Sequence, residues 1–205
     1  MLFVGTKIIK TLKMKKTLKN LLALLVIVLS SYSFTSLLIE KTEINLEESS
    51  ITWKGQKVTG SHEGTIKFKS GTLTFEDGSL VDGTFTMDMN SIKCTDLSGD
   101  YAGKLEGHLK SKDFFGTNEY PTSTLQFKEV TMNGENNYRV KGDLTIKGIT
   151  NSIDFDFEMD GNNATAALKI DRTTYDIKYG SSSFFDGLKD KAIYDDFDIT
   201  VNLEF

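Results

Sequence analysis

The chain of 205 residues is 39% hydrophobic and 26% charged, a composition typical of a globular domain and unlike that of a disordered or low-complexity protein. Six of its 24 Lys and Arg lie in residues 1–36, which hold no acid, so the remainder has 18 basic and 29 acidic residues and a net charge of −11. Such an acidic protein is a poor candidate for binding nucleic acid. The only cysteine, Cys94, excludes an intramolecular disulfide, and we expect it to be a small half-buried residue rather than a nucleophile.

Residues 1–36 have the three-part pattern of a secretory signal peptide. Met14–Lys19 is basic, Leu21–Leu29 is an apolar run too short to span a bilayer comfortably, and small residues such as Ser31 and Ser33 follow. We therefore predict that residues 1–36 are a signal peptide and that the protein is exported, either to the periplasm or out of the cell. The alternative is a segment that is retained as a membrane anchor.

Beyond this segment, alternation of apolar and polar residues predominates and predicts β-strands. Shorter strands are predicted at residues 43–46, 50–54, 65–69, 72–76, 124–131 and 175–179. Longer strands have one apolar face each, formed by Val81, Gly83, Phe85, Met87 and Met89; by Tyr138, Val140, Gly142, Leu144 and Ile146; by Ile153, Phe155, Phe157 and Met159; by Ala164, Ala166, Leu168 and Ile170; and by Phe197, Ile199, Val201, Leu203 and Phe205. Turns rich in Gly, Asn and Asp separate them, and a meander of about eight such strands closes most simply into an antiparallel barrel.

Two segments interrupt the alternation. Leu97–Lys112 repeats an apolar residue every four positions and predicts an amphipathic helix, with Asp96 as its N-cap. Ser181–Asp196 contains the pair Phe184 and Phe185 and predicts a short helix or an ordered loop. The predicted fold class is therefore all-β, an antiparallel eight-stranded barrel with one or two short helices.

Motifs for catalysis and for metal binding are weak. The segment GSHEG (60–64) has His62 where a nucleophile elbow has serine, and Ile66 stands where a zinc-binding HExxH motif needs its second histidine. His62 and His108 could meet near an acid, but we expect His108 to make a hydrogen bond on or beneath the helix. Asp195 and Asp196 are expected in a solvated turn. We predict no catalytic residue, no metal and no cofactor.

Two questions stay open at this level. Arg172 shares the parity of Leu168 and Ile170, so it either points inward, where it needs a partner, or lies beyond a bulge that reverses the alternation before Tyr175. Most of the 14 Phe occupy the apolar faces, where they either fill a closed lumen or line a hollow that accepts a long apolar ligand.

Four motifs then occur in a specific order: TWKGQKVTGSHEGTIKFKSGTL, HLKSKDFFGTNEYPTSTLQF, GDLTIKGIT and DRTTYDIKYG. Through them residues 43–205 resemble the YceI-like family of exported lipid- and polyisoprenoid-binding proteins. The resemblance implies a lipocalin-like barrel that encloses an isoprenoid or another long amphiphile without catalysis. By position it implies that Phe114, Phe115, Tyr120, Arg172 and Tyr175 contact the ligand or shape the mouth of the channel. The apolar faces add five predicted ligand contacts, which are Phe85, Met87, Leu144, Phe155 and Phe157.

The predicted function is carriage, storage or sequestration of a hydrophobic or amphipathic small molecule. Transient contact with a membrane and dimer formation remain open. One competing hypothesis is an enzyme that acts on a lipid-like substrate with His62, His108 and nearby acids. The other is a structural or stress-response barrel that binds nothing.

Overall fold

The computed structural model describes residues 37–205, so the predicted signal peptide lies outside the described residues. Its strands, in chain order, are β1 (Ile39–Glu43), β2 (Ser50–Lys57), β3 (Gly60–Glu76), β4 (Ser79–Cys94), β5 (Thr122–Met132), β6 (Asn137–Ile146), β7 (Ile149–Asp160), β8 (Asn163–Asp171) and β9 (Ile193–Glu204). Helix α2 (Gly99–Lys110) follows β4, and two short 3-10 helices, η1 (Arg172–Tyr175) and η2 (Lys189–Lys191), lie between β8 and β9.

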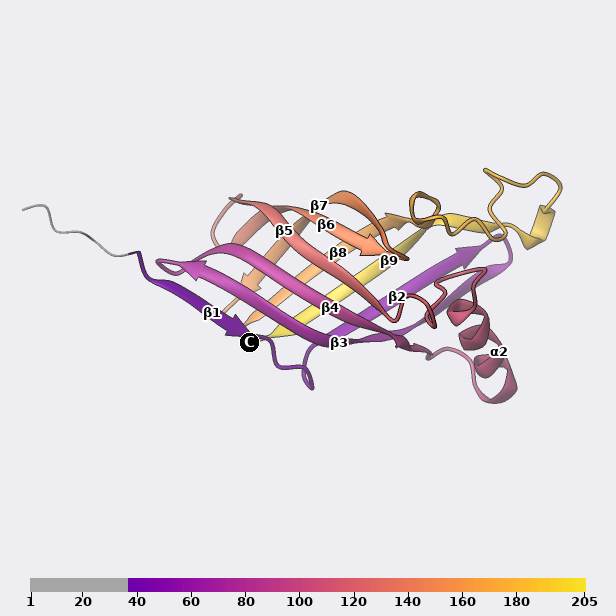
Figure 1. The fold of residues 1–205 in the computed structure, drawn as a ribbon, viewed down its shortest axis with the longest axis horizontal. Coiled ribbons are helices and arrows are strands. Elements are labelled where there is room, and N and C mark those ends of the chain that lie inside the picture. Colours follow the sequence, from indigo (N-terminus) through magenta and orange to yellow (C-terminus); the bar gives the residue numbers. More distant parts are fainter. Residues whose placement is uncertain (1–36) are drawn as a thin grey trace, which may run out of the picture. The chain divides into compact units, whose positions relative to one another are not determined.

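Strands β2 to β9 form a closed antiparallel barrel of eight strands, as predicted (Figure 1). Strand β3 closes it, because β3 pairs with β2 along one edge and with β4 along the other. Strand β1 is an addition to the barrel. It pairs with Thr72–Glu76 of β3, beyond the part of β3 that pairs with β2.

The predicted alternation places the apolar faces inside the barrel, with one exception. Phe85, Phe155 and Phe157 are buried, but Val81 is 40% exposed and its neighbour Leu80 is buried instead. The register explains the exception: Thr74 of β3 pairs with Asp82 while Phe75 pairs with Leu80, which leaves Val81 without a partner. This irregularity reverses the alternation of β4 at that point.

Four of the predicted strands differ from the observed ones. The strands predicted at 65–69 and 72–76 are one strand, β3, because Gly71 stays in the ladder opposite Phe85 rather than forming a turn. The strand predicted at 43–46 lies earlier, at Ile39–Glu43. Residues 175–179 are not a strand. The Asp171 carboxylate accepts a hydrogen bond from the Thr173 N–H and caps the start of η1, and the residue after η1, Asp176, lies in the left-handed region (φ 57°).

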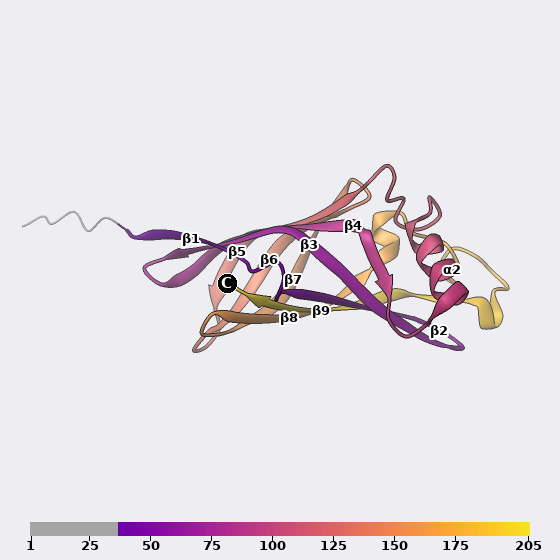
Figure 2. The same cartoon turned by 90° about the horizontal axis from the view of Figure 1, so that it is seen from below.

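Helix α2 confirms the helix predicted at Leu97–Lys112, and it lies at one end of the barrel near β4 (Figure 2). Its N-cap is Ser98, not Asp96. The Asp96 carboxylate instead accepts hydrogen bonds from the Glu63 N–H and the Cys94 thiol, and it pairs with His62. The segment 181–196 forms turns, η2 and the start of β9. Within residues 37–205, no helix has the length and apolar character needed to cross a membrane.

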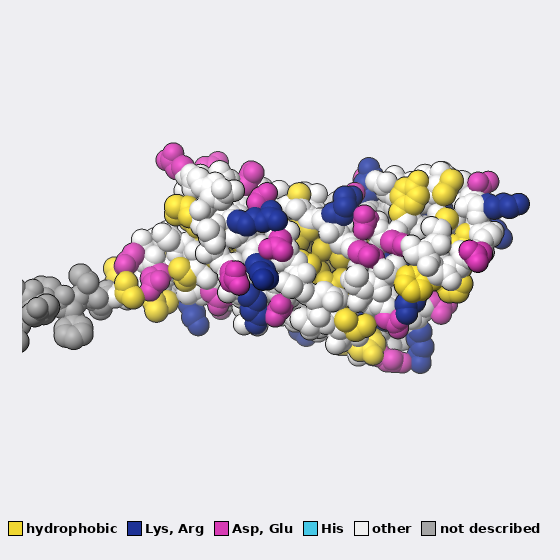
Figure 3. Space-filling model, turned by 90° about the horizontal axis from the view of Figure 1, so that it is seen from above, with side chains coloured by type: hydrophobic (Ala, Val, Ile, Leu, Met, Phe, Trp, Pro, Cys, Tyr) yellow, Lys and Arg dark blue, Asp and Glu magenta, His cyan; other side chains and the backbone are white. Residues whose placement is uncertain are grey.

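The barrel wall is incomplete between β7 and β8. These strands pair only from Phe157 with Ala166 to Asp160 with Asn163, although β7 begins at Ile149 and β8 continues to Asp171. Near the far end of this gap, the Asn151 side chain donates a hydrogen bond to the Thr174 carbonyl of η1. We call the unpaired stretch the β7–β8 gap. The face of the barrel drawn in Figure 3 has a hollow near its middle, where apolar side chains are visible among charged ones.

Candidate ligand-binding site

The barrel interior contains a hollow, which we call the lumen cavity. The volume of this cavity is about 100 Å³. Six of the ten predicted ligand contacts line it, namely Phe85, Met87, Phe115, Leu144, Phe155 and Phe157. The one polar side chain in its lining is Ser123, whose hydroxyl already donates a hydrogen bond to the sulfur of Met89 (3.1 Å). A cavity with such a lining has nothing to hold water and favours apolar ligand atoms.

Aromatic rings shape the lumen cavity, and glycines make room for them. The ring of Phe127 lies 5.6–5.7 Å from the rings of Phe85, Phe155 and Phe157, centroid to centroid. A β-carbon at Gly83 would stand 2.7 Å from the Phe127 ring. Position 83 of β4 faces inward, and only a glycine there leaves enough space for the Phe127 ring.

A second hollow lies between α2 and the end of the barrel, and we call it the helix-side pocket. The volume of this pocket is about 220 Å³. Strands β2, β3, β4 and β9, helix α2 and the loop after α2 all contribute to its lining, and so does Arg172 of η1. Two of the predicted ligand contacts, Phe114 and Arg172, line this pocket alone, and Phe115 lines both hollows.

Three apolar residues separate the two hollows. Ile66, Phe115 and Phe197 belong to the walls of both, and the rings of Phe115 and Phe197 stand 6.4 Å apart in an edge-on arrangement. The lumen cavity and the helix-side pocket are thus adjacent, with these three side chains between them.

Two residues in the wall of the helix-side pocket each carry a buried nitrogen atom that lacks a hydrogen-bond partner among the described residues. These atoms are Nε1 of Trp53, a residue that is 8% exposed, and Nε2 of His108. The hydrogen bond predicted for His108 is thus not found at Nε2. The imidazole packs instead between the rings of Phe114 (5.4 Å) and Tyr179 (4.4 Å).

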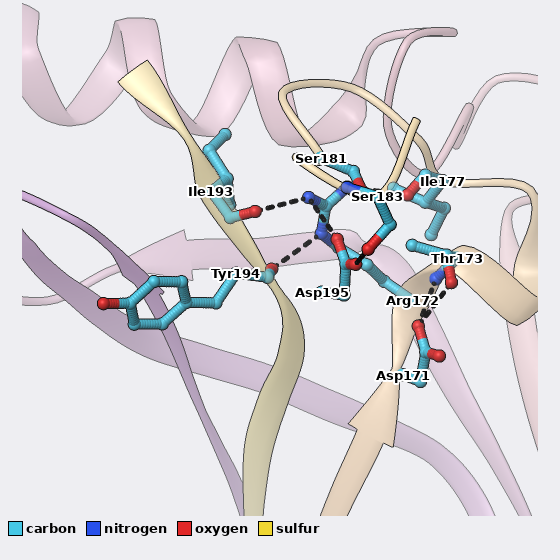
Figure 4. Close-up of polar contacts among 9 residues, drawn as sticks. All are labelled: Asp171, Arg172, Thr173, Ile177, Ser181, Ser183, Ile193, Tyr194 and Asp195. Carbon is cyan, nitrogen blue, oxygen red and sulfur yellow. Dashed lines mark hydrogen bonds and ion pairs between the residues drawn. The ribbon is translucent and has the colours of Figure 1, made fainter. Parts of the chain in front are cut away.

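Arg172 points inward and is 2% exposed, and its partners come mainly from the backbone (Figure 4). Nε donates to the Tyr194 carbonyl (3.0 Å), Nη1 to the Ile177 carbonyl (2.6 Å) and Nη2 to the Ile193 carbonyl (3.0 Å). Nη2 also lies 3.5 Å from Oδ1 of Asp195. Burial lowers the pKa of Arg172, and the charges of Asp195 and Asp171 oppose that shift. The guanidinium thus joins the end of β8 to the start of β9.

The remaining predicted contacts line neither hollow. Tyr120 is 36% exposed and packs against Gly148 and Gly116. Tyr175 is fully buried, and burial raises the pKa of its hydroxyl, an effect that the Asn151 amide partly offsets. Sequence reasoning also missed Trp53 as a wall residue. The signal was available, because Trp53 shares the parity of Ile51 in β2, and both are buried.

His62, Asp96 and Cys94 form a local hydrogen-bonded cluster near the helix-side pocket. Nδ1 of His62 lies 2.9 Å from Oδ2 of Asp96, whose carboxylate also accepts a hydrogen bond from the Cys94 thiol. Burial opposes ionisation of Asp96, but hydrogen bonds from Cys94, His62 and the Glu63 N–H outweigh it and lower its pKa to about 2. Burial also raises the pKa of the Cys94 thiol, which disfavours the thiolate. In the described part of the chain, no three His, Cys, Asp or Glu residues are grouped to hold a metal ion.

Comparisons with known proteins agree with this architecture. The family model described as a YceI-like domain matches residues 43–205. Over 88 residues the chain is 42% identical to "UPF0312 protein SA2479" of Staphylococcus aureus, an alignment that covers 38% of this chain and 48% of that protein. The chain thus spans about half the length of the curated relatives it matches.

Two solved structures share the fold. BcnA of Burkholderia cenocepacia has a TM-score of 0.63 at 23% identity, and the match covers 78% of this chain and 98% of BcnA. A polyisoprenoid binding domain from Saccharophagus degradans has a TM-score of 0.54 at 14% identity, with 82% and 99% covered. At these identities the likeness shows the fold alone.

Proposed function

The chain belongs to the YceI-like family, and we propose that it is an exported binding protein that holds an isoprenoid or another long amphiphile for carriage, storage or sequestration. The observation that carries the proposal is the lumen cavity, a hollow whose lining is almost wholly apolar. Burial of each CH₂ group there contributes about 0.8 kcal/mol. Ten such groups contribute roughly 8 kcal/mol before the entropic cost of binding, which is enough to retain a ligand of very low aqueous solubility.

Native mass spectrometry of the purified protein tests the proposal. We expect a bound mass that organic extraction removes and that a prenyl or long-chain alcohol restores. Ala166 lines the lumen cavity, whereas the next residue, Ala167, is exposed. Ala166→Phe should therefore reduce the bound fraction, while Ala167→Phe should leave it unchanged. An extracted wild-type protein that takes up no long-chain compound would refute a ligand-binding function.

The β7–β8 gap supports a lateral route for the ligand into the lumen cavity. Leu168 borders the gap on β8 and also lines the cavity. The exposed residues Asp154 and Lys169 lie on opposite sides of the gap, while Glu158 and Thr165 are partners in the paired part of the same strands. Cysteines at Asp154 and Lys169, joined by a short bifunctional thiol reagent, should slow ligand release. The same reagent on cysteines at Glu158 and Thr165 should not, and equal release from both cross-linked proteins would contradict the lateral route.

Exposed rings near the helix-side pocket support transient contact with a membrane. Tyr179, Phe184, Phe185 and Tyr194 are each about half exposed, and Lys178 Nζ lies 5.1 Å from the centre of the Phe184 ring. Aromatic rings beside a lysine suit the interface between lipid and water. In flotation with phosphatidylcholine vesicles, Phe184→Ser with Phe185→Ser should lower the bound fraction, and unchanged flotation would argue against this contact.

An enzyme that acts on a lipid-like substrate is the second candidate, because His62 and His108 both line the helix-side pocket. Within residues 37–205, however, no hydrogen bond or ion pair joins the two imidazoles or links His108 to an acid. Binding without turnover is therefore favoured. Mass spectrometry of the ligand after prolonged incubation would reveal a chemical change if the enzyme hypothesis is correct.

The basic and apolar pattern of residues 14–36 supports export. Cell fractionation compares the full chain with one that lacks residues 2–36. We expect only the full chain outside the cytoplasm, and cytoplasmic retention of the full chain would contradict export.

A further inference from the structure

We infer that the helix-side pocket binds the uncharged oxygen head group of the ligand through hydrogen bonds from Trp53 Nε1 and His108 Nε2, while the apolar tail occupies the lumen cavity. The inference rests on the proposed function and deepens it, because it assigns a direction to the ligand and a chemical class to its head. The expected ligand is a long-chain or prenyl alcohol, aldehyde or ketone.

The unpartnered nitrogens are the first support. Buried polar side-chain atoms in folded proteins nearly always have a hydrogen-bond partner. Trp53 is more than nine-tenths buried, its indole N–H can only donate, and the described residues supply it with no acceptor. His108 is only partly buried as a residue, but its Nε2 atom is buried without a partner among the described residues, and the residue lines the same pocket. A ligand oxygen there would accept from Trp53, and it would accept from or donate to His108, depending on the imidazole tautomer.

The contrast with the lumen cavity is the second support. Its one polar lining side chain, Ser123, already uses its hydroxyl proton on Met89. A ligand oxygen there would lose its hydrogen bonds to water without replacement, which is costly. Ile66, Phe115 and Phe197 line both hollows, so an elongated ligand that displaces these side chains would extend from the lumen cavity into the helix-side pocket.

The charges around the helix-side pocket favour a neutral head over an anion. The Arg172 guanidinium lines the pocket, but three carbonyls and Asp195 already engage it. His62 is paired with Asp96, and Asp196 lines the pocket but is exposed, so its carboxylate can remain in water. Lys57 also lines the pocket but is exposed, so its ammonium group can remain in water. Among the described residues of this pocket, a phosphate head would therefore find no free buried cation to receive it.

Calorimetric titration of the extracted full chain tests the head-group class with three probes that share one tail: farnesol, the hydrocarbon farnesene and farnesyl phosphate. One neutral hydrogen bond corresponds to roughly a 2- to 12-fold gain in affinity. We expect farnesol to bind more tightly than farnesene by a factor in this range or above it. We expect farnesyl phosphate to bind more weakly than farnesol. Trp53→Phe and, separately, His108→Leu should reduce the advantage of farnesol and leave farnesene unchanged.

Each contrary result has a distinct meaning. Equal affinity of the wild type for farnesol and farnesene would overturn the head-group assignment and leave tail binding intact. Tightest binding of the phosphate would overturn the neutral class. An equal loss for both probes in the two variants would show that these side chains act only in packing. If the wild type binds none of the three, both the assignment and the proposed function fail.

The single tryptophan permits a test of direction without any substitution, because Trp53 lies in the wall of the helix-side pocket. Long-chain alcohols that carry bromine either beside the hydroxyl or at the far end of the chain quench a nearby indole. We expect strong quenching of Trp53 fluorescence by the first compound and weak quenching by the second. The reverse order would show that the tail, not the head, occupies this pocket.

Discussion

Replacement of Arg172 by Met should destabilise the barrel strongly, because it removes the joint between the end of β8 and the start of β9. The substitution keeps much of the apolar stem and removes the guanidinium, so the carbonyls of Ile177, Ile193 and Tyr194 lose their donors. Loss of one partner from a buried charged pair costs about 3–5 kcal/mol, and each buried acceptor left without a donor costs about 1–3 kcal/mol. Some of these carbonyls can turn toward water, so we expect a loss of about 3–5 kcal/mol in total.

Urea unfolding followed by Trp53 fluorescence measures this loss as a lower midpoint at unchanged slope. The chain has one other arginine, Arg139, which serves as the matched control. Arg139 is half exposed in its side chain and pairs with Asp156 at 3.0 Å on the outside of the barrel. Arg139→Met should cost no more than about 1 kcal/mol, as for other surface ion pairs. A cost for Arg172→Met as small as that of Arg139→Met would refute the assignment of Arg172 as a structural joint.

Three further predictions concern the rings, the glycines and one acid. Phe114→Ala should lower the free energy of unfolding by about 3–5 kcal/mol, since Phe114 is 7% exposed and packs on Arg172. Phe115 is less buried, so Phe115→Ala should lower the free energy of unfolding by less but should speed the release of bound ligand. Equal effects of the two variants on stability and on release rate would contradict this division. Gly83→Ala should cost about 1–3 kcal/mol in urea unfolding because of the clash with Phe127, whereas Gly55→Ala, with nothing within 4 Å of the added carbon, should cost less than 1 kcal/mol. Asp96 has a pKa near 2 in the folded protein against 3.8 as its ordinary value, so its ionised form stabilises the fold above about pH 4, and that stabilisation disappears as the pH falls toward 2. The stability difference between the wild type and Asp96→Asn should follow this course, and a difference that does not depend on pH would show that Asp96 acts only through packing.

The residues that line the lumen could be predicted from the sequence, because the alternation of side chains along each strand determines which of them face inward. Side chains alternate across a strand, so residues two apart share a face, and Phe155 and Phe157 could be assigned to the interior without any knowledge of their neighbours. The same reasoning was wrong where the ladder is irregular. Val81 is unpaired in β4, and the strand predicted at 175–179 is replaced by the last residue of η1 and the irregular segment that follows it, because a register shift and a local cap depend on partners elsewhere in the chain.

The helix-side pocket was not predictable in the same way. Its wall combines Trp53 of β2, His108 of α2 and Phe197 of β9, which are far apart in the sequence and share no period. Arg172 illustrates the same limit, because its main partners are backbone carbonyls, which every residue has and which no sequence pattern marks.

The sequence by itself determined that this chain forms an antiparallel barrel with an apolar interior, and its ordered motifs indicated the family. Both depend on local alternation and turn chemistry, which neighbouring residues specify. Only the tertiary structure decided that the interior is hollow, that β7 and β8 part along the wall, and that Trp53 and His108 face one pocket. These features depend on strand tilt, register and the fit of rings around the lumen, which follow from the closure of the barrel as a whole.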